Sequence, residues 1–366
     1  MLSYRKLAMR VLGRPLHTEG ISSPHPASQR AAAFILTAAM LTTLAAPAFA
    51  EIWHIEDGDI TVKAGETGND VTQKGTTTYG DTDTIITNSD KNTASSHTVT
   101  IETNDKNDKV EVTLKDVNID TSSRNNAAVS VTGEGDTNIK LDGDNALKSD
   151  TYRSGIYGSG SGSLTISGGE NDSLTAQGGS GANGISSSGS LTISGGTVTA
   201  NGDDGGRGIS SSGSVTISGG STVTANGGSG TISGGDGICS SGGVTISGGS
   251  TVTANGGNGG SLVGGDGIRS GGGLTVSDGT VTAKGGNGDS KDGYGGDGIR
   301  SGGVVTISGN TVNAAGGYGG KVGGYGICSF DRVAISGGTV EAAGGNGSTG
   351  GGSGIYSSVI DLSGSL

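Results

Sequence analysis

The stretch GGDGIRSGGGLTVSDGTVTAKGG, residues 264–286, combines the alternating apolar and polar residues of a β-strand with a very high glycine content. The whole chain has 78 Gly among 366 residues, and only 3% of its residues are aromatic, so it cannot build a core of large side chains. Flexible linkers are also glycine-rich, but here the glycines flank short β-branched runs that recur. Collagen is excluded, because Gly does not occupy every third position and there are only 4 Pro.

A repeat of 24 to 31 residues explains this combination. In residues 151–366, the dipeptide Gly-Ile recurs eight times, with the isoleucines at Ile156, Ile185, Ile209, Ile238, Ile268, Ile299, Ile327 and Ile355. Each unit reads Gly-Ile-x-Ser, a run such as residues 215–218 (VTIS), a glycine turn, a run such as residues 222–225 (TVTA), and a glycine-rich loop of variable length. Self-similarity at such a period is typical of repeat architectures that stack supersecondary units.

Three short strands per repeat predict one coil of a right-handed parallel β-helix. Side chains alternate between the two faces of a strand, so one set of apolar residues in each coil points inward. In one repeat, this set is Ile238, Val244, Ile246, Val252 and Ala254. Equivalent residues would stack in aliphatic ladders, which lets small side chains form a core. We therefore predict an all-β solenoid of about eleven coils, roughly 50 Å long at ~4.8 Å per coil.

The chain divides into three segments by composition. Residues 1–50 carry a basic region, a short apolar stretch at residues 31–46 and the small residues Ala48 and Ala50 around Phe49, which together predict a signal peptide with a long basic region. Residues 51–150 are expected to form degenerate coils and an N-terminal cap, in which Trp53 covers the open end. Residues 151–366 hold the glycine-rich coils. The apolar stretch is too short to span a membrane.

Cleavage after Ala50 would leave 17 basic and 33 acidic residues, a net charge of about −16. An acidic exported chain is a poor partner for nucleic acid, because phosphate binding needs a basic face. The expected location is secreted or at the cell surface, with no transmembrane segment after cleavage. Calcium is a plausible companion ion in such surroundings.

The order of the strands resembles a known family. The motifs that carry the resemblance are HTVTIET, VEVTLKDVNID and SGIYGSGSGSLTISGG, followed by GANGISSSGSLTISGGTVTANGG. They are similar to those of the secreted bacterial carbohydrate-binding β-helix family, over most of residues 52–366. This resemblance implies a pectate-lyase-like fold and binding of polygalacturonate-type acidic polysaccharide. The motifs specify the coil better than they specify the ligand.

Two columns on the outer surface are candidate sites. The residue after each anchoring isoleucine forms the first, which includes Tyr157, Arg269, Arg300 and Tyr356 as candidate carbohydrate-binding residues. Arg269 and Arg300 form either a small carboxylate-binding ladder or two solvated arginines screened by neighbouring aspartates. The second column holds those aspartates, Asp236, Asp266 and Asp297. They either bind Ca²⁺ through oxygen ligands or bond nearby backbone amides.

Two further patterns have weaker functional meaning. Cys239 and Cys328 share the outward column but lie three coils apart, roughly 14 Å, so we expect two exposed free thiols and no disulfide. Pairs of threonines, such as Thr222 and Thr224, form a flat array of the kind found in ice-binding β-helices. Asn313 and Glu341 interrupt that array.

These observations predict a non-enzymatic, exported carbohydrate-binding protein that recognises acidic, pectin-like extracellular polysaccharide, with Ca²⁺ as the candidate cofactor. No nucleophile, base and orienting acid can be assembled from the sequence. The first alternative is an adhesin or autotransporter-passenger-like surface protein. The others are a polysaccharide lyase and an ice-binding protein. The chain stops within what would be the second strand of a further coil, so self-association through that coil is another expectation.

Overall fold

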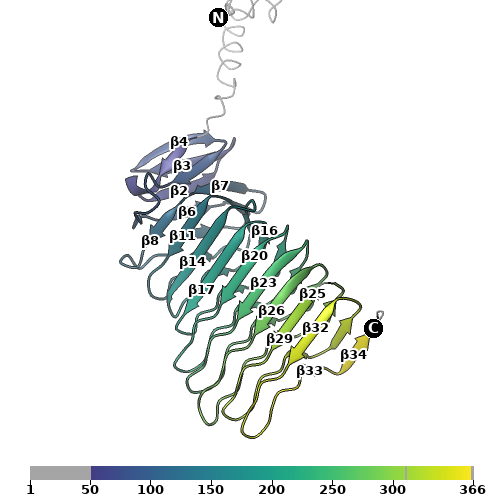
Figure 1. Ribbon diagram of the computed structural model, residues 1–366. Coiled ribbons are helices and arrows are strands. Elements are labelled where there is room, and N and C mark those ends of the chain that lie inside the picture. Colours follow the sequence, from purple (N-terminus) through teal and green to yellow (C-terminus); the bar gives the residue numbers. More distant parts are fainter. Residues whose placement is uncertain (1–50, 310, 364–366) are drawn as a thin grey trace, which may run out of the picture. The chain divides into compact units, whose positions relative to one another are not determined.

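The computed structural model describes residues 51–309 and 311–363. The predicted signal peptide at residues 1–50 lies outside these described residues. Contacts divide the chain into Met1–Pro47 and Ala48–Leu366, and every described residue belongs to the second unit. This unit is a parallel β-helix of about ten turns, close to the eleven coils that the repeat predicts. Figure 1 shows its strands stacked side by side from the N-terminal to the C-terminal coils.

Three sheets run along the solenoid, and each repeat contributes one strand to each sheet. Sheet A contains the strands that begin with the anchoring isoleucines, together with the N-terminal strands that pair with them. These are β2 (Ile60–Ala64), β3 (Asn69–Gln73), β4 (Thr76–Asp81), β6 (Val99–Glu102), β9 (Val129–Thr132), β12 (Ile156–Gly158), β15 (Ile185–Ser187), β18 (Ile209–Ser211), β21 (Ile238–Ser240), β24 (Ile268–Ser270), β27 (Ile299–Ser301), β30 (Ile327–Ser329) and β33 (Ile355–Tyr356).

Sheet B contains the strands of the VTIS type: β1 (Ile52–His54), β5 (Thr84–Thr87), β7 (Lys109–Lys115), β10 (Asp136–Asp142), β13 (Leu164–Ser167), β16 (Leu191–Ser194), β19 (Val215–Ser218), β22 (Val244–Ile246), β25 (Leu274–Val276), β28 (Val305–Ile307), β31 (Arg332–Ile335) and β34 (Val359–Leu362). Sheet C contains those of the TVTA type: β8 (Asn118–Asp120), β11 (Asp144–Lys148), β14 (Ser173–Ser180), β17 (Thr197–Asp203), β20 (Thr222–Asn226), β23 (Ser250–Asn255), β26 (Gly279–Lys284), β29 (Thr311–Ala315) and β32 (Thr339–Ala343).

The core consists of the predicted aliphatic ladders. The anchoring isoleucines pair in register from one coil to the next, for example Ile238 with Ile268 and Ile268 with Ile299. The five residues predicted to point inward in one repeat are all buried, with at most 1% of their surface exposed. Because every coil repeats the same inward set, small and medium side chains fill the interior without large aromatic residues.

The serine in each Gly-Ile-x-Ser strand is also buried, and its hydroxyl explains its place in the repeat. Ser240 Oγ donates to the carbonyl of Gly213 at 2.8 Å, and Ser301 Oγ donates to Gly272 at 3.0 Å. In each case, the acceptor belongs to the turn of the preceding coil. Each of these carbonyls also accepts a backbone N–H, from Gly242 at 3.1 Å and from Gly303 at 2.7 Å, so the hydroxyl supplies the second hydrogen bond of the carbonyl oxygen.

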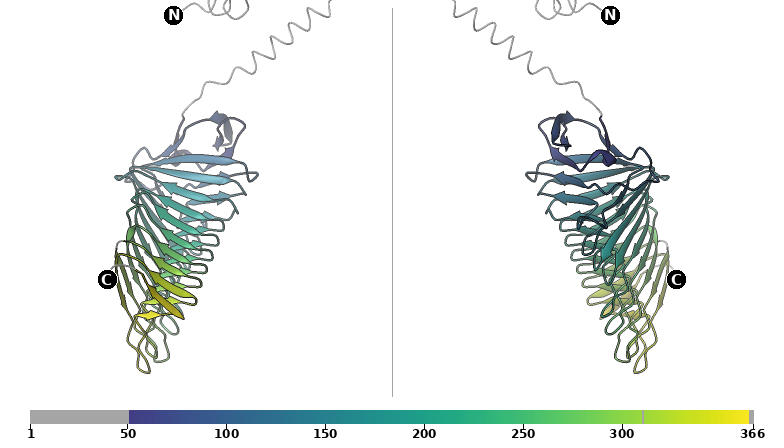
Figure 2. Two further views of the ribbon diagram at one scale, coloured as in Figure 1. Left: turned by 90° about the vertical axis from the view of Figure 1, so that its right-hand side faces the viewer. Right: turned by 90° about the vertical axis from the view of Figure 1, so that its left-hand side faces the viewer.

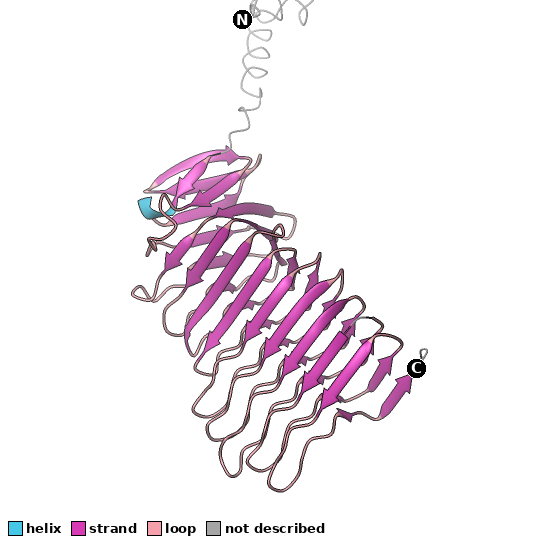
Figure 3. Cartoon of the chain, viewed as in Figure 1, coloured by secondary structure: helices cyan, strands magenta, loops and turns pink. Residues whose placement is uncertain are grey.

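The N-terminal coils differ from the others in having an antiparallel cap. β2 pairs in parallel with β6, but β3 pairs antiparallel with β2, and β4 pairs antiparallel with β3. Trp53 lies in β1 with only 8% of its surface exposed, and its indole nitrogen donates to Asp81 Oδ2 at 3.0 Å. The single helical element of the described residues is the 3₁₀ turn η1 (Ile55–Asp57), drawn in cyan in Figure 3.

Five long glycine-rich loops connect sheet C to sheet A, and we call them together the fin: residues 227–236, 256–266, 285–297, 316–325 and 344–353. The last four extend below the front sheet in Figure 1 and stack on one another in both views of Figure 2. Backbone hydrogen bonds cross the fin in a zigzag: Gly235 donates to Gly228 at 2.9 Å, and Gly257 donates to Gly235 and Gly265 donates to Gly257, both at 2.8 Å. The same alternation continues to Gly352.

Close approach of neighbouring backbones requires glycine in the fin. A Cβ atom on Gly265 would overlap the carbonyl oxygen of Gly235, and one on Gly257 would overlap that of Gly228. Neither glycine has a positive φ, so the requirement is for space rather than for a left-handed backbone. The high glycine content therefore builds a hydrogen-bonded layer. The loops at this edge differ in length between repeats, and so do the turns between sheets B and C, for example 168–172 and 195–196.

Candidate functional site

The outward column of sheet A is continuous, as the repeat predicts. Successive register pairs join Tyr157 to Ser186, Ser210, Cys239, Arg269, Arg300, Cys328 and finally Tyr356. Arg269 and Arg300 are direct neighbours. Tyr157 lies four coils before Arg269, and Tyr356 lies two coils after Arg300, roughly 19 and 10 Å away at ~4.8 Å per coil. The structure thus brings the two arginines together but places the two tyrosines at separate ends of the column.

The three aspartates stand on the edge of sheet A and bond the backbone of the following coil. Asp236 Oδ1 accepts the backbone N–H of Asp266 at 2.9 Å, and Asp266 Oδ1 accepts that of Asp297 at 2.8 Å. Asp297 Oδ1 in turn accepts the N–H of Tyr325 at 2.7 Å. One oxygen of each carboxylate therefore ties two coils together, a role in which it satisfies a backbone donor.

The second carboxylate oxygens face arginines. Arg269 Nε lies 2.9 Å from Asp266 Oδ2 and 3.7 Å from Asp236 Oδ2. Arg300 Nε lies 3.1 Å from Asp266 Oδ2, and its Nη2 lies 2.8 Å from Asp297 Oδ2. The aspartates are almost fully buried, whereas 45% of the Arg269 side chain and 34% of the Arg300 side chain are exposed. The arginines therefore screen the carboxylates and still reach solvent.

A third arginine, Arg207, completes this arrangement. It occupies the aspartate position of its own coil, and its Nε lies 3.3 Å from Asp236 Oδ2. Its backbone N–H donates to Asn183 Oδ1 at 2.8 Å. Asn183 therefore makes the same bond to the next coil that the three aspartates make, and we call this series of bonds the aspartate ladder. The aligned repeats place Arg207 directly before Asp236, which was a usable signal, but the sequence analysis did not name Arg207 as a site residue.

Burial opposes ionisation of these carboxyl groups. Desolvation, followed by repulsion from Asp236, raises the pKa of Asp266, although Arg300 and Arg269 act in the opposite direction. Desolvation and repulsion from Asp266 raise the pKa of Asp297 to about 6. Arg300 Nη2 lies close to Asp297 Oδ2, but that oxygen has no aligned hydrogen bond. The burial cost therefore outweighs the ion pair at Asp297.

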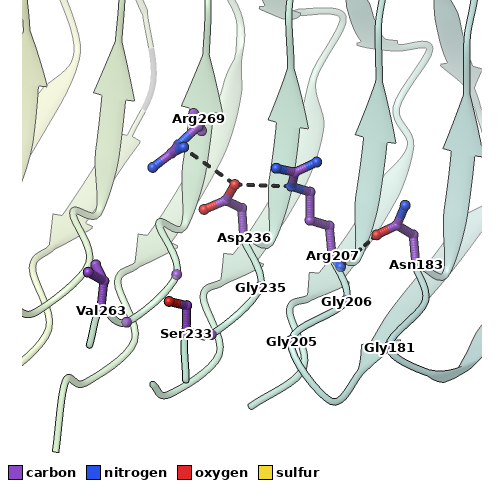
Figure 4. Close-up of a pocket in the computed structure, with 13 residues that line it drawn as sticks. Gly181, Asn183, Gly205, Gly206, Arg207, Ser233, Gly235, Asp236, Val263 and Arg269 are labelled. Atoms are coloured by element: carbon purple, nitrogen blue, oxygen red, sulfur yellow. Dashed lines mark hydrogen bonds and ion pairs between the residues drawn. The ribbon is translucent and has the colours of Figure 1, made fainter. Parts of the chain in front are cut away.

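A groove of about 470 Å³ lies beside the aspartate column, at the edge of sheet A. Its other lining residues belong to the return limbs of the loops, by which we mean the part of each loop that leads back into sheet A. Figure 4 shows Asp236 between Arg207 and Arg269, with Val263 on the loop of the following coil. The groove is lined by Gly181, Asn183, Gly205, Gly206, Arg207, Ser233, Gly234, Gly235, Asp236, Val263, Gly264, Gly265 and Arg269. It can present guanidinium groups to an anion, because 42% of the Arg207 side chain is exposed as well.

The two predicted tyrosines have different surroundings. Tyr157 lines a smaller hollow of about 220 Å³ with Tyr152, and this hollow shares Gly181 and Asn183 with the arginine groove. Tyr356 stacks on Tyr325, with the ring centroids 4.8 Å apart and the planes inclined by 18°. Both tyrosines are about half exposed, so each leaves ring surface available to a ligand.

The calcium hypothesis stays a prediction. Within residues 51–309 and 311–363, no group of three or more His, Cys, Asp or Glu side chains is placed to hold a metal ion. Asp236, Asp266 and Asp297 already direct their oxygens at backbone amides and arginines. A cation at these carboxylates would compete with three guanidinium groups.

One cysteine differs from its prediction. Cys239 and Cys328 are both free, as expected, but only Cys239 is partly exposed, and Cys328 has 2% of its surface exposed. Its neighbours in the column, Arg300 and Tyr356, have long side chains that flank a short one. The expectation of two exposed thiols is therefore wrong for Cys328.

The threonine array has the predicted register. Thr197, Thr222, Thr251, Thr280, Thr311 and Thr339 pair in succession on sheet C, and the second column changes from Thr282 to Asn313 and Glu341. Ice binding stays a prediction.

No protein-family model matches this chain, and neither a curated protein nor a solved structure is significantly similar to it. No helix in the described part of the chain is long and apolar enough to cross a membrane.

Proposed function

We propose that this protein is an exported, non-enzymatic binder of acidic extracellular polysaccharide, and that the ligand lies along the outward face of sheet A at the arginine groove. One observation carries the proposal. Arg207 and Arg269 flank Asp236 on opposite sides, and the closest contacts of both arginines with carboxylates run through Nε. An arginine held through Nε can still offer its two terminal nitrogens to a second carboxylate.

The arrangement suits a long ligand better than a small one. The groove crosses four successive coils, and the column on either side ends in exposed tyrosines. An acidic polysaccharide presents carboxylates at regular intervals, so several weak contacts can add along the chain. The repeated geometry favours binding over catalysis, because each coil offers a similar set of groups rather than a single reactive centre.

The experiment measures retention of the purified protein on insoluble polygalacturonate and on neutral glycans, while unsaturated product is recorded. The doubly substituted R207K, R269K protein keeps a positive charge beside the buried aspartates but loses the planar fork, so we expect retention to weaken about tenfold. R332K is the matched control, because Arg332 is 47% exposed on sheet B. Unchanged retention of the double variant would count against the arginine groove.

Other outcomes decide the alternatives. Unsaturated product would indicate a polysaccharide lyase, and absence of binding to every glycan would favour an adhesin or passenger-like surface protein. Retention in both Ca²⁺ and EGTA is expected, because arginines already face the three aspartates. Loss of retention in EGTA would instead favour a calcium bridge between Asp236, Asp266 or Asp297 and the glycan.

Self-association is a separate proposal, carried by the last described coil. In β34, the side chains of Val359, Ile360 and Leu362 are 49–58% exposed, and Val340 and Ile355 are only partly buried. Exposed apolar strand edges promote pairing with another chain. Sedimentation at increasing protein concentration tests this proposal. An I360K variant should remain monomeric where the wild type associates.

A further inference from the structure

The return limbs of the fin carry an apolar strip beside the arginine groove. Val263, Tyr294 and Val322 pair as parallel bridges in three successive loops, and we call these three residues the fin strip. Side chains at paired positions of parallel strands point to the same side. Val263 and Tyr294 are 40% and 43% exposed, so the strip presents its apolar surface to solvent rather than to the core.

The fin strip extends one wall of the groove. Val263 lines the groove together with Asp236 and Arg269, so the side on which Val263 lies is the ligand side of the fin. Tyr294 and Val322 continue this side over the next two coils. Over those coils, Arg300 follows Arg269 in the outward column, on strand β27, into which the limb that carries Tyr294 leads. A ligand that follows the arginines would therefore have the fin strip beside it.

The fin strip also carries a cation. Lys321 Nζ lies 5.5 Å from the centroid of the Tyr294 ring, within the range of a cation–π interaction. Lys321 precedes Val322 on the same return limb. This side of the fin thus combines an aromatic ring, two valines and an ammonium group, and it continues into the strands that carry the guanidinium groups. This combination complements a polymer that has both negative charges and an apolar ring face.

The fin is suitable as a wall because its backbone is fixed. The zigzag of glycine hydrogen bonds links each loop to the loops before and after it. Side chains on such a layer keep their spacing from coil to coil, and a preorganised wall loses little entropy when a ligand binds.

We infer that the fin strip is the second wall of the ligand site, and that Tyr294 packs on the apolar face of a sugar ring whose carboxylate meets the arginines. The inference rests on the proposed function and deepens it. The site would select an acidic glycan over an acidic polymer of similar charge that lacks sugar rings, because only the glycan can use both walls.

Fluorescence anisotropy with two labelled probes tests this assignment on the whole purified protein. One probe is an oligogalacturonate, and the other is a poly-glutamate peptide with the same number of carboxylates. We expect Y294A to weaken glycan binding about fivefold, in line with the loss of one aromatic contact. Y294F should bind like the wild type. Y318A is the matched control, because Tyr318 is 48% exposed on the outgoing limb of the fin, whereas Tyr294 lies on the return limb and pairs with Val263 of the groove.

The peptide separates packing from charge. Poly-glutamate affinity should be the same for the wild type and Y294A. Equal losses for both probes would overturn the assignment, since the tyrosine would then act on charge or folding. Unchanged glycan affinity of Y294A would overturn it as well, while leaving the arginine groove intact. If the wild type does not bind the glycan, the proposed function is wrong. The assignment of the fin strip then fails with it.

Discussion

The carboxylate of Asp266 accepts the backbone N–H of Asp297 at 2.8 Å, and these two residues occupy the same position in neighbouring repeats. The side chain of one coil therefore completes the backbone hydrogen bonding of the next. Because Arg269 and Arg300 contact the other carboxylate oxygen, one aspartate connects the ladder to the groove. We therefore expect substitutions of Asp266 to change both the stability of the fold and the position of the arginines.

The first prediction separates the ladder bond from the charge of Asp266. D266N keeps an oxygen acceptor for the N–H of Asp297, whereas D266A leaves that buried donor without a partner. We expect D266A to be less stable than D266N by about 1–3 kcal/mol. Urea unfolding of the two variants at the same pH measures the difference. Equal free energies of unfolding would mean that the ladder bond contributes nothing.

The second prediction concerns pH. Burial and Asp266 raise the pKa of Asp297 to about 6, from 3.8 for an unperturbed aspartate. A raised pKa means that the folded protein loses stability as pH rises through this interval, since the ionised carboxylate is disfavoured in the fold. D297N removes the ionisable group and can keep the bond to Tyr325. It should therefore exceed the wild type in stability at pH 8, by at most about 3 kcal/mol.

Urea unfolding at pH 8 and at pH 3.5 tests this dependence. The advantage of D297N should nearly disappear at pH 3.5, where the wild-type carboxyl is protonated in the folded state and mostly protonated in the unfolded state. D289N is the matched control, because Asp289 is an exposed carboxylate on the fin. A D297N variant that is less stable than the wild type at pH 8 would show that the Arg300 ion pair outweighs the burial cost.

The repeat predicted the coil correctly for a physical reason. In a stacked parallel solenoid, each residue neighbours its own equivalent, so alignment of the repeats is already a list of contacts. The Ile238 to Ile268 ladder and the Arg269 to Arg300 pair follow directly from it. The aspartate alternative in which carboxylates bond backbone amides also agrees with the structure, although the amides belong to the next coil.

Other features could not be obtained in this way. The antiparallel β3 and β4 cap lies outside the repeat, so no alignment predicts its pairing. The burial of Cys328 depends on the sizes of Arg300 and Tyr356 beside it. The fin strip, in contrast, was within reach of the alignment, because Val263, Tyr294 and Val322 each lie five residues before the anchoring isoleucine that follows. The cap and the burial of Cys328 required the path of the backbone and the sizes of neighbouring side chains.

The third prediction tests the glycine layer of the fin. G265A would place a Cβ against the carbonyl oxygen of Gly235, whereas nothing lies within 4 Å of a Cβ on Gly350. Neither residue has a positive φ, so the two substitutions differ in space and not in backbone strain. We expect G265A to lower the free energy of unfolding by about 1–3 kcal/mol and G350A to change it little. Thermal and urea unfolding compare them. Similar effects of both substitutions would contradict a close-packed fin.

The fourth prediction concerns the two thiols. Desolvation and the charge of Asp297 raise the pKa of Cys328 to about 11, and its side chain is almost fully buried. The reactive thiolate is then scarce at pH 8, about a hundredfold less than for a thiol with a pKa of 9. A C239S variant, which retains only Cys328, should therefore react with DTNB very slowly when native and rapidly in urea.

A C328S variant supplies the comparison, because it retains only the partly exposed Cys239. Burial also raises the pKa of Cys239, so its native reaction should be slower than in urea but faster than that of Cys328. If native C239S protein reacts as fast as the unfolded chain, the coil around β30 must open readily. That result would also predict weak positioning of Arg300 and Tyr356, the neighbours of Cys328 in the outward column, and hence weaker ligand contacts at this end of the column.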